Sequence, residues 1–419
     1  MSAIDYEPAE ARKVVAEARR LAADDPAVVL AGDQNSNVPV WDARRGMKVV
    51  ARFPIPGRSP LAMRTQRSEA AILRAVPGVA HFFPQVLYED PDGAFAIHTW
   101  EEDVLVGNVP GGPAPLRLFR PIARVWADLQ SYQMGGGVQA RRDLPPELIR
   151  NQEVRRPDRP PVRSAATTQA AYIQLHRRET AMRFDKAVVA TGDYLHTVFG
   201  FPAHPERFAA GAVEELEDVP LTIAIPDLHR GNYGRRPDGS LLLFDPEGIG
   251  YHPPMYALAV AAVFGEYTDD DSAAFVAEHR AAAPAGLLPF FDRHFEAWEQ
   301  FATVQRAIGI TCGAVNQMAR KGRSGYDEAL EAWTGRLHRI VNAAGRIWGG
   351  PELSPGFVRD HLDRAAQVHR RTQSLGGGPA AALAGFGVAR ARSVTPPRGR
   401  TAVPGRQATG MGRALELSK

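Results

Sequence analysis

Cysteine is almost absent from this chain of 419 residues, which contains only Cys312. A single cysteine excludes an internal disulfide framework, is too isolated to indicate a zinc site, and fits a reducing cytoplasm. Long apolar runs are also missing, since none approaches the ~18 residues that a membrane-spanning helix needs. The first residues include acids and lack the apolar core of a signal peptide. We therefore expect a cytoplasmic protein with no membrane segment.

The chain also has almost no excess of positive over negative charge, because its net charge is only +3. Residues 375–419 contain seven basic residues and one acid, so the rest of the chain carries about −3. This C-terminal stretch is rich in Gly, Pro and Ala and poor in large apolar residues, which predicts a disordered basic tail. We therefore expect no nucleic-acid partner for the folded part, because the basic balance of the whole chain comes from its tail.

Short apolar runs dominate the first hundred residues, and helical periodicity dominates the rest. The patterns predict helices over 6–24 and 66–75, and strands over 28–32, 38–41, 47–55, 86–88 and 94–98. Further helices are predicted over 116–132, 165–199, 271–281 and 288–347, with a proline-rich loop over 134–164. This order predicts an α+β fold with two lobes. Residues 1–104 would form a small β-rich lobe, and residues 105–374 a larger α-helical lobe.

The strongest candidate site lies in the predicted α-helical lobe, residues 105–374. Asp227 is followed by Asn232 and, after a turn and the apolar run Leu241–Phe244, by Asp245. Phosphoryl transfer requires a carboxylate that receives a hydroxyl proton, together with oxygen ligands that hold magnesium on ATP. The alternative is structural, with an aspartate that caps a turn and an asparagine in a tight loop.

These residues resemble a known signature. Ile225-Pro226-Asp227-Leu228-His229-Arg230-Gly231-Asn232, followed by Leu242-Leu243-Phe244-Asp245-Pro246-Glu247, is similar to the His-Gly-Asp-x-His-x-x-Asn and Asp-x-Glu motifs of the aminoglycoside phosphotransferase and choline kinase-like group. The resemblance implies a bilobal protein-kinase-like fold that uses ATP and Mg²⁺. It also implies that Asp227 is the catalytic carboxylate, that Asn232 and Asp245 bind magnesium, and that Glu247 supports a second ion.

The chain departs from that signature at three positions. Ile225 and Pro226 replace the first histidine and glycine, and Tyr256 stands where the group often has an aspartate. The missing histidine usually supports the loop in the group, so its loss leaves the proposed chemistry in place. A nucleotide-binding protein with weakened or lost catalysis is the alternative that these departures support.

The N-terminal segment offers a cation and an acid suited to the same chemistry. Kinases place a cation on a strand to neutralise the phosphates of ATP, and a helical acid holds that cation. Arg52 lies in the middle of a predicted strand, and Glu69 lies on the predicted helix that follows. Lys48 is a rival cation because alternation places it on the same face as Arg52. The simpler alternative is that Arg52 pairs with an acid at the surface.

A polar segment before this strand is the candidate phosphate loop. Gly32, Ser36 and Asn37 belong to a short stretch whose backbone N–H groups could approach an anion, although a plain turn is an equally simple interpretation. His229, two residues after Asp227, either touches substrate or metal or is a satisfied loop histidine.

The substrate is less well specified by the sequence. We expect specificity to come from residues 134–170 and the helices after 265, where the acids Glu266 and Asp269–Asp271 either attract a cationic substrate or form a solvated face. The leading hypothesis is an ATP- and Mg²⁺-dependent phosphotransferase that acts on a hydroxyl of a small molecule. The remaining alternative is a kinase that acts on Ser or Thr of a peptide.

Overall fold

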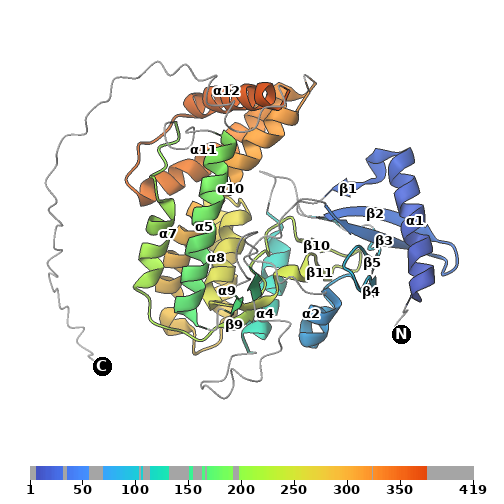
Figure 1. Cartoon of the computed structure of the whole chain (residues 1–419). Helices are drawn as coiled ribbons and strands as arrows, with labels where there is room; N and C mark the ends of the chain where they lie inside the picture. Colours follow the sequence, from blue (N-terminus) through green and yellow to red (C-terminus); the bar gives the residue numbers. More distant parts are fainter. Residues whose placement is uncertain are drawn as a thin grey trace, which may run out of the picture.

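The chain forms a small lobe, built on a sheet and one long helix, and a larger lobe made mostly of helices (Figure 1). The computed structural model describes residues 6–31, 35–55, 69–102, 105–106, 114–131, 151–153, 163–165, 168–191, 198–322 and 324–374. The predicted tail, Gly32 and most of the proline-rich segment lie outside these residues. Both the α+β class and the two-lobed arrangement are confirmed.

The small lobe is a five-stranded antiparallel sheet covered on one face by a helix. Its elements are α1 (Pro8–Asp24), the 3₁₀ turn η1 (Pro26–Val28), β1 (Leu30–Ala31), β2 (Asn35–Asp42), β3 (Met47–Pro54), β4 (Val86–Glu89) and β5 (Ala96–Thr99), and the strand order is β1-β2-β3-β5-β4. The apolar stripe of α1, which includes Val14 and Val15, packs against alternate residues of the sheet such as Val38 and Val49. Because alternate residues of a strand face opposite sides, the other face of β3 is left for the large lobe.

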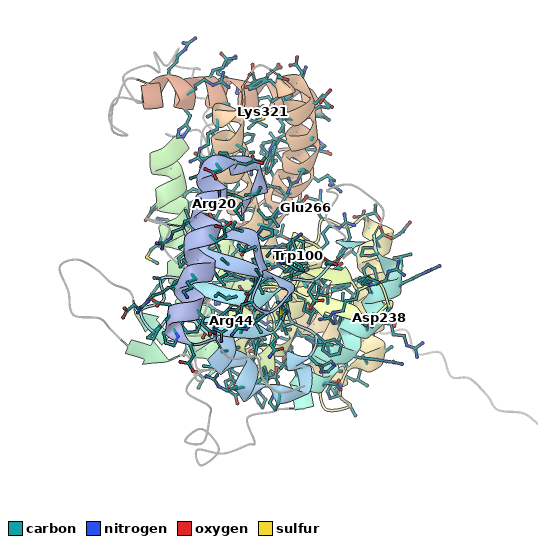
Figure 2. The ribbon with its side chains drawn as sticks, turned by 90° about the vertical axis from the view of Figure 1, so that its right-hand side faces the viewer. Arg20, Arg44, Trp100, Asp238, Glu266 and Lys321 are labelled. Atoms are coloured by element: carbon teal, nitrogen blue, oxygen red, sulfur yellow. The ribbon has the colours of Figure 1, made fainter. Side chains whose placement is uncertain are left out.

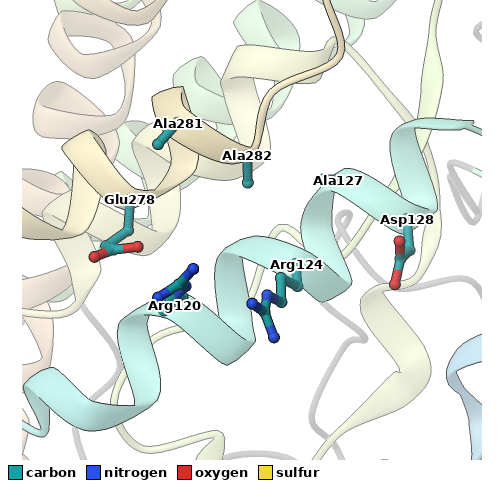
Figure 3. A pocket seen from close by; sticks show the side chains of 7 residues that line it. All are labelled: Arg120, Arg124, Ala127, Asp128, Glu278, Ala281 and Ala282. Carbon is teal, nitrogen blue, oxygen red and sulfur yellow. The ribbon is translucent and has the colours of Figure 1, made fainter.

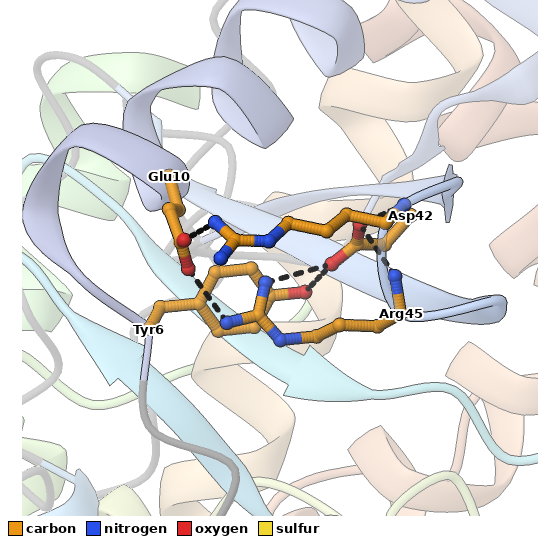
Figure 4. Close-up of polar contacts among 5 residues, drawn as sticks. Tyr6, Glu10, Asp42 and Arg45 are labelled. Atoms are coloured by element: carbon orange, nitrogen blue, oxygen red, sulfur yellow. Dashed lines mark hydrogen bonds and ion pairs between the residues drawn. The ribbon is translucent and has the colours of Figure 1, made fainter.

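A polar cluster joins α1 to the turn between β2 and β3 (Figure 4). The Tyr6 hydroxyl donates to Asp42 at 2.5 Å, and the Arg45 guanidinium lies 3.7 Å from the centre of the Tyr6 ring. Arg45 also bonds Glu10 at 2.7 Å and Asp42 at 3.2 Å. Burial alone raises the pKa of Asp42, but the hydrogen bonds from Tyr6 and Arg45 outweigh it and lower that pKa. The cluster therefore fixes the N-terminal helix on the sheet with satisfied charges.

Two helices that follow the third strand in sequence belong to the core of the large lobe. These helices are α2 (Glu69–Ala75) and α3 (Pro77–Ala80). Ile72 of α2, Val79 of α3 and Val76 between the helices lie in the same apolar cluster as the large-lobe helices. The Leu243 N–H also donates to the Phe82 carbonyl at 2.7 Å. The helix that carries Glu69 is therefore anchored on the large lobe. The boundary at residue 104 stays a prediction.

The large lobe consists of helices around a set of short strands. The helices are α4 (Leu116–Ser131), α5 (Gln169–Thr191), α7 (Pro205–Glu214), α8 (Pro254–Phe264), α9 (Asp269–Ala282), α10 (Phe291–Arg320), α11 (Tyr326–Ile347) and α12 (Pro355–Ser374), with the 3₁₀ turns η2 (Pro246–Gly248) and η3 (Leu288–Phe290). The strands are β6 (Leu105–Val106), β7 (Asn151–Glu153), β8 (Arg163–Ala165), β9 (Thr222–Ala224), β10 (Tyr233–Arg235), β11 (Leu241–Leu243) and β12 (Gly250–His252). None of the described helices has the length and apolar character needed to cross a membrane.

The centre of this lobe is α8, which is buried along nearly its whole length. Nine consecutive residues from Pro254 to Ala262 are buried, and α8 packs along the long helix α10. Buried on all sides, this helix has no polar face and hence no amphipathic period. It packs against β9, and the loop that follows β9 carries the candidate catalytic residues.

Candidate active site

The loop after β9 brings Asp227 and Asn232 together. The Asn232 side-chain nitrogen donates to the Asp227 carbonyl at 2.8 Å, and the Asn232 carbonyl accepts from the Phe244 N–H, also at 2.8 Å. The second bond continues the pairing of β10 with β11. Because Asp245 directly follows Phe244, this bond holds the backbone of Asp245 close to Asn232. The predicted grouping of Asp227, Asn232 and Asp245 around one hairpin is therefore what the backbone forms.

Asp245 has an unusual backbone conformation. Its φ of 53° and ψ of 66° lie in the left-handed region, which aspartate tolerates better than most residues because its short side chain bonds locally. The turn directs its carboxylate toward the small lobe, where Oδ1 accepts from Nη2 of Arg52 at 2.6 Å. Strained backbone held by its surroundings is a feature of functional sites.

Arg52 forms ion pairs with acids from two different elements. Besides Asp245, its Nη2 lies 3.3 Å from Oε1 of Glu69 on α2. The exposed fractions of the three side chains are 13% for Arg52, 8% for Glu69 and 28% for Asp245, so the group is largely buried between the lobes. The predicted pairing of Arg52 with Glu69 is present in the structure, and the contact with Asp245 adds a partner that the sequence did not indicate.

His98 belongs to the same group and was missed by the sequence analysis. Its Nε2 lies 3.6 Å from Oε2 of Glu69, and it pairs with Val50 across β3 and β5. Burial, followed by the charge of Arg52, lowers the pKa of His98 to about 3, so the imidazole is neutral. The alternation that places Lys48 on the face of Arg52 also places His98 there, once the register of β5 is known.

The rival cation has a different neighbour. Lys48 Nζ lies 4.1 Å from the centre of the Trp100 ring, at the junction between the lobes. On the neighbouring strand, Asn37 pairs with Arg52 and Ser36 with Phe53, so Asn37 and Ser36 point to opposite faces of the sheet. The strand begins at Asn35, which places both residues in β2 rather than in the phosphate loop that we expected to contain them. Pairing of this segment with β3 explains the difference.

His229 is held by the backbone of the loop that carries Asp227 and Asn232. Its Nδ1 accepts from the Gly231 N–H at 3.0 Å, so a neutral ring carries its proton on Nε2. That atom lies 3.6 Å from Oδ1 of Asp227. The arrangement leaves Asp227 partly exposed, with an exposed fraction of 17%, and orients its carboxylate.

The oxygen donors suit magnesium bound together with a nucleotide. Since the side-chain nitrogen of Asn232 is used by Asp227, the amide oxygen is the atom left for a metal, alongside the Asp245 carboxylate. Magnesium needs only one or two protein ligands when phosphates and waters complete its shell. Among the described residues no group of three or more His, Cys, Asp or Glu could hold a metal on its own. The side chain of Glu247, in η2, lies outside the described part.

Two buried residues support the turn that follows Asp245. The Nδ1 atom of His252 lies 2.6 Å from the Tyr172 hydroxyl, and its Nε2 atom lies 3.1 Å from the Gly248 carbonyl oxygen. One tautomer satisfies both contacts if Tyr172 donates to Nδ1 and Nε2 donates to Gly248. Tyr256 is buried in α8 beside them, 3.4 Å from His176 Nδ1 and from Gln305 Oε1. The tyrosine that departs from the signature is thus part of a packed core.

The junction between the lobes is held by an ion pair. Both oxygens of Glu101 lie 3.1 Å from nitrogens of Arg236, which belongs to the turn of the β10–β11 hairpin. A bidentate pair of this kind fixes orientation as well as distance. Glu101 therefore has a structural partner.

The acids expected to attract a cationic substrate have partners or structural roles. Glu266 is held by Arg336, at 2.6 and 2.7 Å, and by Arg306. Burial raises the pKa of Glu266, but the two arginines outweigh it and keep the pKa below its usual value. Asp269–Asp271 form the first turn of α9, where negative charge is favourable. The expectation of a cation-attracting cluster is not supported at Glu266, whose charge is already neutralised.

Comparisons with known proteins find likenesses at the level of solved structures only, since no family model and no curated protein matches the chain. The choline kinase LicA from Streptococcus pneumoniae aligns at 13% identity and a TM-score of 0.44, covering 80% of this chain and 99% of that one. An ethanolamine kinase from Plasmodium vivax aligns at 10% identity and a TM-score of 0.47, covering 74% and 80%. A type I macrolide 2′-phosphotransferase aligns at 15% identity and a TM-score of 0.43, covering 80% and 98%.

Proposed function

We propose that the protein transfers a phosphate group from Mg²⁺-bound ATP to a hydroxyl of a small molecule. The observation that carries the proposal is the contact of Arg52, on β3, with Asp245, at the end of the β10–β11 hairpin. It places a permanent cation from one lobe against an oxygen ligand from the other, beside a loop that holds a partly exposed carboxylate. A phosphate chain bound between the lobes requires this combination of charges.

Each side chain has a role that its position supports. Asp227 would accept the proton of the attacking hydroxyl and orient that group. Asn232 and Asp245 would hold magnesium through their oxygens. When bound, the metal would neutralise charge on the phosphates. Arg52 would bind phosphate oxygens, and Glu69 would keep it in place, because a guanidinium stays charged when buried and binds oxyanions in a bidentate way.

Positioning and electrostatics would supply most of the catalysis. The transfer forms no covalent bond to the protein, so the rate depends on how well hydroxyl, carboxylate and phosphate are aligned. The hydrogen bonds of Asn232 and His229 to their own loop restrict the motion of Asp227 and favour this alignment.

A nucleotide-binding protein without turnover is the second candidate. It is favoured by Ile225 and Pro226, both buried where the signature has histidine and glycine. The peptide-kinase alternative depends on the proline-rich segment, of which only β7 and β8 are described.

Mass spectrometry after incubation with Mg²⁺, ATP and a library of hydroxyl-bearing metabolites tests the proposal. We expect one class of metabolite to gain phosphate with the wild type and with Asp238→Asn, which changes an exposed aspartate of the hairpin turn. Asp227→Asn should abolish the gain. Equal phosphate gain with Asp227→Asn would refute the role of that carboxylate. Nucleotide binding without any product would favour the second candidate.

A further inference from the structure

A second site lies in the large lobe, in a pocket of about 380 Å³ that carries several arginines. The pocket is bounded by the connection between α8 and α9 and by the facing sides of α10 and α11. Its lining includes Glu266, Tyr267, Arg306, Arg336, Arg339 and Arg346. Figure 2 labels Glu266 among the large-lobe helices, in a view that has the small lobe in front. The volume is within the range of pockets that hold small molecules.

The arginines converge because of their spacing. Arg336, Arg339 and Arg346 are three and seven residues apart along α11, which places them on one side of that helix. Arg306 faces them from α10 and shares the carboxylate of Glu266 with Arg336. One carboxylate between two guanidinium groups leaves this part of the pocket with an excess of positive charge.

Donors remain available in this pocket. The Nε atom of Arg306 is buried and has no hydrogen-bond partner within the described part of the chain, so it adds to the positive charge of the wall without itself being exposed. Arg339 and Arg346 are exposed, and no ion pair joins either of them to a carboxylate of the described residues. A guanidinium that lines a concave site and forms no ion pair with a carboxylate is suited to a planar or tetrahedral oxyanion.

The other charged groups of the pocket reduce its preference for an anion but do not remove it. Asp269 and Glu352 also line it, and both are exposed. His338 is occupied, because its Nε2 lies 2.9 Å from the Leu353 carbonyl. Four arginines therefore face three acids, one of which is already held by two arginines.

One wall of the pocket contacts the catalytic loop. The Tyr267 hydroxyl forms a short hydrogen bond with the Tyr233 hydroxyl, and the Arg230 guanidinium lies 5.3 Å from the centre of the Tyr267 ring. Arg230 and Tyr233 flank Gly231 and Asn232 in sequence. A molecule bound in the pocket would therefore press on a residue that packs directly on this loop.

We propose that this pocket binds a small molecule that carries a carboxylate or phosphate group. The inference goes beyond the proposed phosphate transfer, since binding can be measured without ATP. The proposed ligand is an anion, whereas the acids of this region suggested a cationic substrate from the sequence. Inorganic phosphate and malonate represent the two oxyanion sources, and choline serves as a cationic probe of similar size.

The experiment measures thermal stabilisation and calorimetric binding of each probe to the full chain without nucleotide. The variants are Arg339→Gln and Arg346→Gln, which leave the Glu266 pairs intact. The matched control is Arg124→Gln, an exposed arginine of a separate pocket of about 500 Å³ between α4 and α9 (Figure 3). General salt stabilisation affects all variants equally, so the difference between variants reports the pocket.

We expect phosphate or malonate, but not choline, to bind the wild type and Arg124→Gln. Each of the two pocket variants should bind about tenfold more weakly, the effect of losing one charge-assisted hydrogen bond at a partly exposed site. Glu266→Gln should bind the same anion more tightly because it frees two arginines. Response to phosphate alone or to malonate alone identifies the group that the pocket recognises. The proposal is overturned if neither anion binds, or if Arg339→Gln, Arg346→Gln and Arg124→Gln respond alike.

Discussion

Removal of Arg52 should destabilise the protein far more than removal of an exposed arginine. Arg52→Gln leaves Glu69 and Asp245, with exposed fractions of 8% and 28%, facing each other without the cation that both contact. Breaking a buried ion pair by removing one partner costs about 3–5 kcal/mol, and the partial exposure of Asp245 moves the expected loss to about 3 kcal/mol. Urea denaturation with an unchanged m-value measures this loss as a fall in the midpoint.

Arg20 supplies the matched control. It forms ion pairs with Glu17 at 2.6 Å and Asp24 at 2.7 Å, but its side chain has an exposed fraction of 58%. Surface pairs contribute little, so Arg20→Gln should cost much less stability than Arg52→Gln, and high salt should remove even that small cost. Arg52→Gln should keep its larger cost in 1 M NaCl. If the two variants lose the same stability, the claim that Arg52 ties the lobes together is wrong.

Two further predictions concern buried histidines. Because the pKa of His98 is lowered to about 3, the unfolded chain binds its proton first as pH falls below 6.5. The neutral, buried His98 therefore lowers the free energy of unfolding only below pH 6.5, and the loss reaches about 2 kcal/mol at pH 5. His98→Gln should flatten this loss in denaturation curves at pH 7 and 5, whereas the exposed His204→Gln should not, and equal slopes would contradict the assignment. His252→Phe removes the bonds to Gly248 and Tyr172 and should cost about 2–3 kcal/mol. It should also weaken binding of Mg²⁺-ATP, and unchanged nucleotide affinity would show that the turn after Asp245 is held by other contacts.

The part of the site that the sequence could predict is local. Asp227 and Asn232 lie five residues apart in one loop, and Asp245 follows a short hairpin, so strand and turn patterns suffice to group them. The presence of Arg52 and Glu69 on a strand and the next helix is also visible from residue types. The contact of Arg52 with Asp245 spans 193 positions, and only the packing of the two lobes could reveal it.

The missed features share a physical reason. α8 is buried on all sides and has no amphipathic period, so its sequence did not indicate a helix boundary. β2 extends to Asn35 because its polar end pairs with β3, which propensity alone does not favour. The compensation of the Glu266 charge in its pocket depends on Arg306 and Arg336, which come from helices distant in sequence. Long-range partners decided each of these cases.

The central claim is that the two lobes form one site for a magnesium-bound nucleotide, and calorimetric titration with a non-hydrolysable ATP analogue tests it most directly. With Mg²⁺ present, the wild type and Asp238→Asn should bind the analogue. Asp245→Asn should lose the magnesium dependence, and Arg52→Gln should weaken binding at least tenfold. Binding of equal strength in all four proteins, or no binding to the wild type, would contradict the claim.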